Sequence, residues 1–299
     1  MRVEDSGGSG FVGRELTRLL KSKGHEITII SRQPGPGQIS WADVESREGA
    51  VNVAGENIMN PLRWYGFFFL LQSRVSRVKA TKILAQDIAA SPTPPHSWVL
   101  VTGVNLICNI TKYNVINYIS KFVKIEKKLF HIVIIFHNIT VFTVSLIKRL
   151  CAVLGRDGGT MKQMLIPFWL GLDGTLGSGR QPFPWIDVSD LVGIIAYALE
   201  PKEGPPSTEP NVFNGVSPSL NTNFEFTKAL GRSLKRRTIF PVPGFFLDVF
   251  LGSERAVILT QGQKVVPKKT LESGFVFQYP DLTSALKLLD IMAIFGSSV

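Results

Sequence analysis

The stretch Ser6–Gly13 reads S-G-G-S-G-F-V-G, and it decides the fold. Gly7, Gly10 and Gly13 recur at three-residue spacing, and the leucines that follow them recur at helical spacing. A helix that begins inside a glycine run offers unpaired N–H groups and the positive end of its dipole, and glycine lets a phosphate approach the backbone closely. The pattern favours a dinucleotide pyrophosphate site over a plain glycine-rich surface loop.

A second strand is predicted after this helix, over Glu26–Arg32, which is rich in β-branched residues. Its end offers the Ser31 hydroxyl and the Arg32 guanidinium, where an acidic residue would bind the ribose hydroxyls of NAD. A guanidinium suits a 2′-phosphate, so the sequence favours NADP(H) over NAD. The alternative is that Arg32 is simply a solvated residue at a strand end.

The first strand of the unit, Met1–Ser6, departs from the usual pattern. It reads M-R-V-E-D-S and places Glu4 and Asp5 where a central parallel strand normally has apolar residues. Burying unpaired carboxylates is costly. We therefore expect either a poorly formed first strand or a misannotated start of the sequence.

The rest of the N-terminal half alternates strands and helices. Strands are predicted over Ala50–Ala54 and Ser97–Thr102, and an amphipathic helix over Arg74–Ala90. Such alternation indicates an α/β fold with a doubly wound parallel sheet of Rossmann type, whose ligands bind at the carboxyl ends of the strands. Gly55 and Thr102 lie at those ends.

Length and composition narrow the class of protein. The chain has 299 residues, of which 44% are hydrophobic, so it can bury a substantial core. Two cysteines and four scattered histidines show no ligand spacing, so we expect neither a metal site nor a disulfide framework. The glycine turn stands where a signal peptide would have its apolar core, which favours a soluble intracellular protein.

The segment 105–148 differs from the rest of the chain. It contains six of the lysines, no arginine and one acid, Glu126, and so supplies about half of the net charge of +10. No nucleic-acid motif accompanies this charge, so nucleic-acid binding is not expected. The segment also lacks Gly, Ala, Pro and Asp. We interpret it first as translated non-coding or aberrantly spliced sequence, second as buried strands, and third as a membrane helix over Leu129–Ile147.

Six motifs in order resemble one family. They are the glycine turn, I-I-S-R-Q-P-G, V-N-V-A-G-E-N-I-M-N-P-L-R, V-L-V-T-G-V, V-L-G-R-D-G-G and P-F-P-W-I-D-V-S-D-L. Together they are similar to the atypical, extended short-chain dehydrogenases/reductases known as epimerase family proteins, family 39U in particular. The resemblance covers most of residues 1–63, 73–104 and 149–287. It implies a Rossmann-type fold, NADP(H) and an oxidoreductase or epimerase activity on a small carbonyl or hydroxyl substrate.

The resemblance also implies site residues. Those on the cofactor would be Gly7, Gly10, Phe11, Val12 and Gly13 at the pyrophosphate, Ser31 and Arg32 at the adenosine phosphate, and Ala54, Gly55 and Glu56 at the adenine and ribose. Those lining the substrate cleft would be Gln181, Phe183 and Trp185. Core packing is an equal alternative for Trp185, and Ser189 or Asp190 is expected to cap the helix that follows.

The acid–base pair of the dehydrogenase class is missing. Relatives of that class use a Tyr with a Lys four residues later, and none of the five tyrosines here has a Lys at that position. Thr102 is the remaining candidate for a catalytic hydroxyl, although a strand-terminal Thr can equally bond the backbone. The chain is therefore either an active NADP(H)-dependent enzyme or a catalytically inactive nucleotide-binding isoform, and whether it is an enzyme stays uncertain.

Two domains are predicted. Residues 1–200 would form the NAD(P)-binding domain, and the proline-rich stretch 201–210 a linker. Residues 211–289 resemble the small C-terminal α+β domain of the same family, on the substrate side.

Overall fold

The computed structural model describes residues 1–31, 33–40, 48–53, 80–86, 88, 90, 95–103, 143–150, 152–156, 158–159, 161, 164, 174–201, 211–235, 241–246 and 260–288. The chain divides into two compact units. The first unit is Met1–Asn105, Ile119–Lys148 and Val192–Phe213, and the second is Leu106–Tyr118, Arg149–Leu191 and Asn214–Val299. The second unit thus includes residues 149–191, which the sequence grouped with the N-terminal domain.

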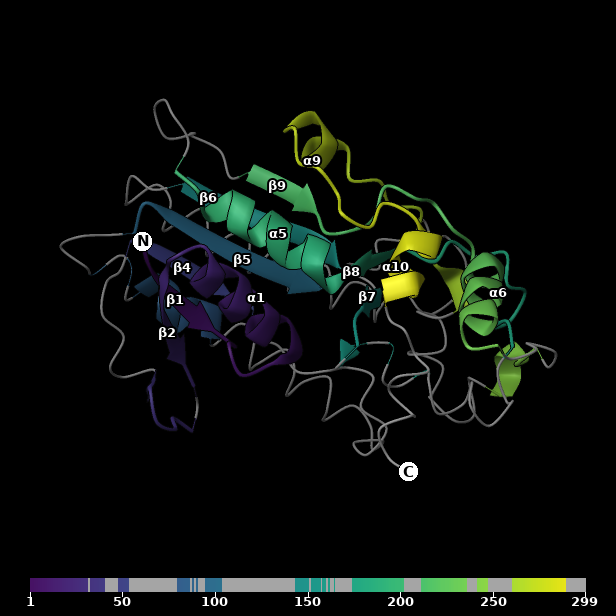
Figure 1. The fold of residues 1–299 in the computed structure, drawn as a ribbon, viewed down its shortest axis with the longest axis horizontal. Coiled ribbons are helices and arrows are strands. Elements are labelled where there is room, and N and C mark those ends of the chain that lie inside the picture. The colour runs from purple at the N-terminus through teal and green to yellow at the C-terminus, as the bar shows by residue number, and fades with distance from the viewer. Residues whose placement is uncertain are drawn as a thin grey trace. The chain divides into compact units, whose positions relative to one another are not determined.

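A seven-stranded sheet runs in the order β3-β2-β1-β4-β5-β6-β9 (Figure 1). The strands are β1 (Arg2–Ser6), β2 (Glu26–Ile30), β3 (Gln38–Ile39), β4 (Gly49–Asn52), β5 (Ser97–Gly103), β6 (Thr143–Leu150) and β9 (Asn211–Asn214). The pairs β1–β2, β1–β4, β2–β3 and β4–β5 are parallel. Because the order steps outward from β1 in both directions, the predicted α/β, doubly wound sheet is confirmed.

Helices cover both faces of this sheet. On one face lie α1 (Phe11–Ser22), which contacts β1 and β2, and α5 (Val188–Leu199) (Figure 1). The Ser97 hydroxyl donates to the carbonyl of Leu199 at 2.8 Å and ties β5 to α5. On the other face, helical residues 80–86 bury Leu84 among apolar side chains of the sheet. These side chains are Ile30, Ala50, Trp98 and Leu100.

The first strand forms in full, so the expectation of a poorly formed strand is wrong. Every residue of β1 is in register with β2, and Val3–Ser6 are also in register with β4. Pairing on both sides satisfies the backbone groups whatever the side chains are. The cost falls on the side chains instead, because Glu4 is 2% and Asp5 is 0% exposed.

Part of the compositionally distinct segment belongs to the main sheet. Residues 104–142 lie outside the described residues, but Thr143–Leu150 forms β6 between β5 and β9. Residues 143–148 are therefore strand, as the second interpretation expected of the segment. A membrane helix was the third interpretation, over Leu129–Ile147. Residues 143–147 of that range belong to β6 and are strand rather than helix. Within the described residues, no helix is long and apolar enough to cross a membrane.

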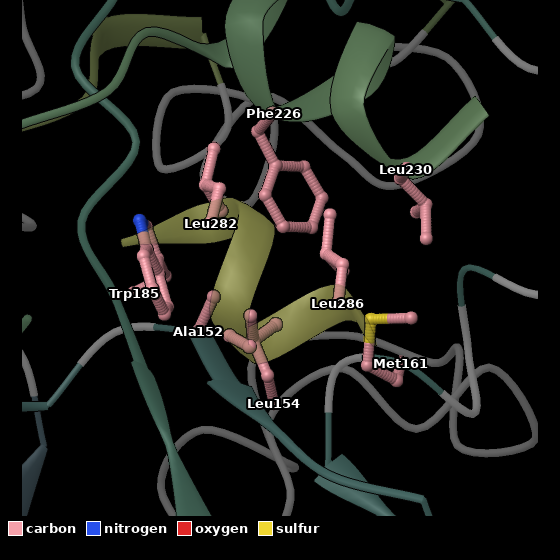
Figure 2. Packing of buried hydrophobic residues seen from close by; sticks show 9 residues of the cluster. Ala152, Leu154, Met161, Trp185, Phe226, Leu230, Leu282 and Leu286 are labelled. Atoms are coloured by element: carbon pink, nitrogen blue, oxygen red, sulfur yellow. The ribbon is translucent and has the colours of Figure 1, made fainter. Parts of the chain in front are cut away.

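The second unit has its own core (Figure 2). It contains the parallel pair β7 (Ala152–Leu154) and β8 (Trp185–Asp187), with α6 (Asn223–Ser233), α9 (Lys268–Glu272) and α10 (Leu282–Leu288). The helix α6 begins at Asn223 with a capping box, in which the Thr222 hydroxyl accepts the Glu225 N–H and the Glu225 carboxylate accepts the Thr222 N–H. The buried side chains in Figure 2 come from β7, β8, α6 and α10, together with Met161 between β7 and β8 in the sequence, and all of them are apolar.

Candidate nucleotide-binding site

The carboxyl ends of four adjacent parallel strands meet at one edge of the sheet. The residues in register there are Ile30, Ser6, Asn52 and Leu100. Ser31 and Gly7 come directly after two of these strands, and Thr102 lies two residues beyond Leu100 on β5. Segments predicted separately from the sequence are therefore brought to the same edge, which is where α/β sheets bind ligands.

The loop between β1 and α1 needs its glycines. Gly7 has φ +102°, in the left-handed region, and its carbonyl accepts the N–H of Gly10 at 2.9 Å. A Cβ on Gly13 would collide with the Gly7 carbonyl and the Gly8 backbone. A Cβ on Gly10 would lie 3.2 Å from the Gly7 carbonyl oxygen, although the φ of −75° at Gly10 suits any residue. The turn thus packs tightly onto the first turn of α1.

The start of α1 leaves backbone donors without a side-chain cap. Gly10 is the N-cap and has no side chain with which to accept a hydrogen bond, and no acidic residue lies in the first turn. The first N–H groups, beginning at Phe11 and Val12, are left for an external acceptor. Arg14 adds a cation beside the loop, where its Nη1 donates to the Ser9 carbonyl at 3.0 Å. The residues present fit a pyrophosphate.

The residues on the adenosine side are only partly described. Ser31 lies just past β2, where its backbone N–H bonds the Ile39 carbonyl at 3.0 Å. Its hydroxyl donates to the Gln33 carbonyl at 3.1 Å and accepts the Gln33 N–H at 3.3 Å. The hydroxyl therefore organises the turn after β2. Arg32, the predicted partner of the 2′-phosphate, lies outside the described residues.

The chain leaves β4 beside the glycine loop. The Val53 N–H donates to the Ser6 carbonyl at 2.9 Å, and the Asn52 side chain links Ser6 (3.5 Å) to Thr81 (3.2 Å). This network was not predicted from the sequence, because Asn52 looked like an ordinary strand residue. The predicted ribose and adenine residues follow directly but lie outside the described residues. They are Ala54, Gly55 and Glu56.

A buried carboxyl group lies next to this site. Asp5, on β1, is fully buried, and a Cβ on Gly8 would lie 3.1 Å from its Oδ2. Burial raises the pKa of Asp5 to about 8, and the nearby Thr17 hydroxyl lowers that pKa by a smaller amount. From the sequence, Asp5 was recognised only as an acidic residue that is unfavourable in a central strand.

The three predicted substrate-cleft residues lie in the second unit and have structural contacts. Trp185 is 1% exposed, and its indole N–H donates to Asn221 at 2.9 Å. The ring of Phe183 lies 4.3 Å from that of Phe226, and the Gln181 amide donates to a backbone carbonyl at 2.7 Å. These contacts support the core interpretation of Trp185. Contact of the three with a substrate stays a prediction.

The cap of α5 differs from the prediction. Asp187, rather than Ser189 or Asp190, caps the helix, because its Oδ1 accepts the Ser189 N–H at 2.8 Å. Asp190 instead accepts the backbone N–H groups of Gln278 (2.7 Å) and Tyr279 (3.0 Å). Burial raises the pKa of Asp190, and these two bonds partly oppose that rise.

A hollow of about 300 Å³ lies at the opposite, amino-terminal edge of the strands in the first unit. Met1 and Glu48, which precede β1 and β4, line it together with His25, His96 and Leu199. The hollow therefore lies at the opposite end of these strands from the glycine loop. Among the described residues, no group of three or more His, Cys, Asp or Glu side chains could hold a metal ion.

Comparison with known proteins gives consistent matches. A family model described as a domain of unknown function (DUF1731) matches residues 242–289. The chain is 43% identical to epimerase family protein SDR39U1 of Bos taurus and 41% identical to that of Homo sapiens, over 96% of this chain and 99% of each relative. The crystal structure of human SDR39U1 (isoform 2) with NADPH superposes with a TM-score of 0.84 at 38% identity, covering 97% of this chain and 99% of that one. A UDP-N-acetylglucosamine 4-epimerase from Bacillus cereus shares the fold, with a TM-score of 0.70 at 13% identity over 98% of this chain and 99% of that one.

Proposed function

The chain belongs to the epimerase family that includes SDR39U1, and from this premise we propose that it binds NADP(H) at the glycine loop as an oxidoreductase or epimerase. The observation that carries the proposal is the uncapped start of α1 beside a glycine turn at the carboxyl edge of the sheet. Its N–H groups and dipole would bind the pyrophosphate. The NADPH-bound human relative supports the same cofactor.

NADP(H) is preferred to NAD(H) on chemical grounds. The turn after β2 contains a hydroxyl at Ser31 and a guanidinium at Arg32, and no carboxylate directly follows β2. A carboxylate would repel a 2′-phosphate, whereas a guanidinium binds it with two hydrogen bonds. We expect Arg32→Ala to weaken NADPH binding and to leave NADH binding nearly unchanged.

The proposed reaction is hydride transfer between the nicotinamide and a small carbonyl or hydroxyl substrate. When bound, the cofactor supplies or accepts the hydride. Thr102 would orient the substrate oxygen from the end of β5. A second candidate function, nucleotide binding without turnover, is favoured by the absence of a Tyr followed by a Lys four residues later. In that case the protein would hold the cofactor but would lack the group that moves the proton.

Cofactor binding is tested by titrating the full chain with NADPH and NADH and following nicotinamide fluorescence. We expect saturable binding of NADPH and weaker binding of NADH. Gly10→Ala adds a Cβ to the phosphate path at an accessible φ, and it should weaken NADPH binding about tenfold or more, or 1.4 kcal/mol. Gly244→Ala, which meets no atom closer than 4.0 Å, is the matched control. Absence of binding of either nucleotide rules out both candidate functions.

Turnover then separates the two candidates. NADPH oxidation is measured with a panel of small aldehydes and ketones, and NADP⁺ reduction with the matching alcohols. Turnover that Thr102→Ala abolishes and Thr102→Ser retains supports the enzyme and the role of the hydroxyl. Saturable binding without turnover across the panel supports the second candidate.

A further inference from the structure

We propose that Asp5 links cofactor binding to a proton, so that the dinucleotide binds at full affinity only while the Asp5 carboxyl is protonated. This inference rests on the proposed function, because it concerns the same glycine loop. It assigns to Asp5 a role in tuning affinity from beneath the loop, without contact with the reacting atoms.

The Asp5 carboxyl lies next to Gly8 of the glycine loop. Asp5 lies on the face of the sheet that α1 covers, because Thr17 of α1 is close enough to affect the Asp5 carboxyl. Ile29 and Val51 are in register with Asp5, so their side chains lie on the same face. A Cβ on Gly8 would lie 2.9 Å from Ile29 Cγ1 and 3.1 Å from Asp5 Oδ2. The carboxyl therefore lies directly against the loop that would hold the pyrophosphate.

Among the described residues, no compensating charge lies against the Asp5 carboxyl. Asp5 is 0% exposed, and neither of its oxygens has a partner at full hydrogen-bonding distance among the described residues, with only a weak effect from Thr17. The charged residues of α1 nearest the loop are Arg14, Glu15 and Arg18. Arg14 is exposed and bonds the Ser9 carbonyl, while Arg18 is paired with Glu15 at 2.8 Å.

In the part of the chain that the structure describes, the other elements packed against this face add no charged side chain. The residues of β2 and β4 in register with Asp5 are Ile29 and Val51, and the stretch of α5 in the first unit, Val192–Leu199, has no titratable side chain except Tyr197. Glu4 is also buried, but alternation places it on the opposite face of β1. An ionised Asp5 would therefore draw on the dipole and N–H groups of α1, which are the groups that would hold the pyrophosphate.

Ionisation of Asp5 would weaken binding of the pyrophosphate. Burial raises the pKa of Asp5 to about 8, so the group is neutral at pH 7 and becomes charged over the mildly alkaline range. A carboxylate under the loop repels the pyrophosphate in a medium of low dielectric constant. By linkage, the bound cofactor must in turn raise the pKa of Asp5 further, and a rise of one unit corresponds to about a tenfold change in affinity.

The experiment measures the NADPH dissociation constant of the full chain at several pH values from about 7 to 9.5, where the cofactor's 2′-phosphate has already ionised. We expect the constant of the unaltered protein to rise about tenfold through this range. Asp5→Asn mimics the protonated acid and should bind tightly with a flat pH profile. Glu4→Gln, on the opposite face of the same strand, is the matched control and should follow the unaltered protein.

A second measurement does not depend on a variant. At pH 8.5, calorimetric titration with NADPH in two buffers of different ionisation enthalpy should show uptake of a fraction of a proton. A flat affinity profile with no proton uptake, or a rise that Asp5→Asn shares, overturns the proposal. Failure of every variant to bind NADPH at any pH overturns the proposed function instead, so the two results are distinguishable.

Discussion

Strand β1 and the core of the second unit are equally buried, but they are built from different chemistry. Glu4 and Asp5 of β1 are 2% and 0% exposed, and Phe226 and Trp185 of the second unit's core are 0% and 1% exposed. The nine buried residues of that core are all apolar, whereas β1 places two carboxyl groups inside the sheet. Burial of apolar surface stabilises the second unit, while burial of Asp5 lowers the stability of the first.

Backbone pairing can fix the place of a strand in a sheet even where the side chains of that strand are unfavourable to bury. β1 pairs along both edges and takes the central place despite its acids. The cost of burying a charged carboxylate appears as a raised pKa of Asp5, which favours the protonated form. Such a group persists where the surrounding structure determines it, and it is a candidate for function because it lies at the site.

The largest expected effect concerns the pH dependence of the first unit's stability. Because the pKa of Asp5 is raised from 3.8 to about 8, the folded state keeps a proton that the unfolded state releases. Stability should therefore fall as pH rises from about 4 to about 8, by up to roughly 5 kcal/mol. Asp5→Asn should remove this slope. Urea unfolding at a series of pH values measures it, and equal slopes in the two proteins would refute the assignment.

The next effect concerns the apolar side of the comparison. Phe226→Ala removes a fully buried ring that packs 4.3 Å from Phe183, and we expect a loss of about 4 kcal/mol from the second unit. Phe224→Ala, on the same helix but 51% exposed, is the matched control and should cost about 1 kcal/mol or less. Urea unfolding followed by tryptophan fluorescence measures both. Equal losses would mean that the core is less closely packed than Figure 2 shows.

The fold and the glycine loop could be predicted from sequence because they depend on local signals. Helical spacing after the glycine run indicated α1, and the β-branched run was enough to place β2 within two residues. The formation of β1 and the cap at Asp187 could not be predicted, because the first depends on pairing with β4 and the second on where β8 ends. Local propensity does not contain these long-range terms.

A third effect tests whether partners make a buried carboxylate tolerable. Asp190, in the second unit, is also buried, but it accepts two backbone N–H groups, from Gln278 and Tyr279. Asp190→Ala would leave both donors without this acceptor and should cost about 2 to 3 kcal/mol in urea unfolding. Because burial raises the pKa of Asp190, Asp190→Asn should also reduce any loss of stability as pH rises above 3.8. If Asp190→Ala were stabilising, the contrast with Asp5 would fail.

The smallest effect concerns the start of α6, where Thr222 and Glu225 pair their polar groups at the surface. The Thr222 hydroxyl accepts the Glu225 N–H at 3.2 Å, and the Glu225 carboxylate accepts the Thr222 N–H at 2.7 Å. Thr222→Ala breaks one half of this box and should cost about 1 kcal/mol, while Thr222→Ser should restore most of it. Both are measured by urea unfolding at constant pH. A loss as large as that of Phe226→Ala would show that the entry into α6, and not the apolar core, limits the stability of the second unit.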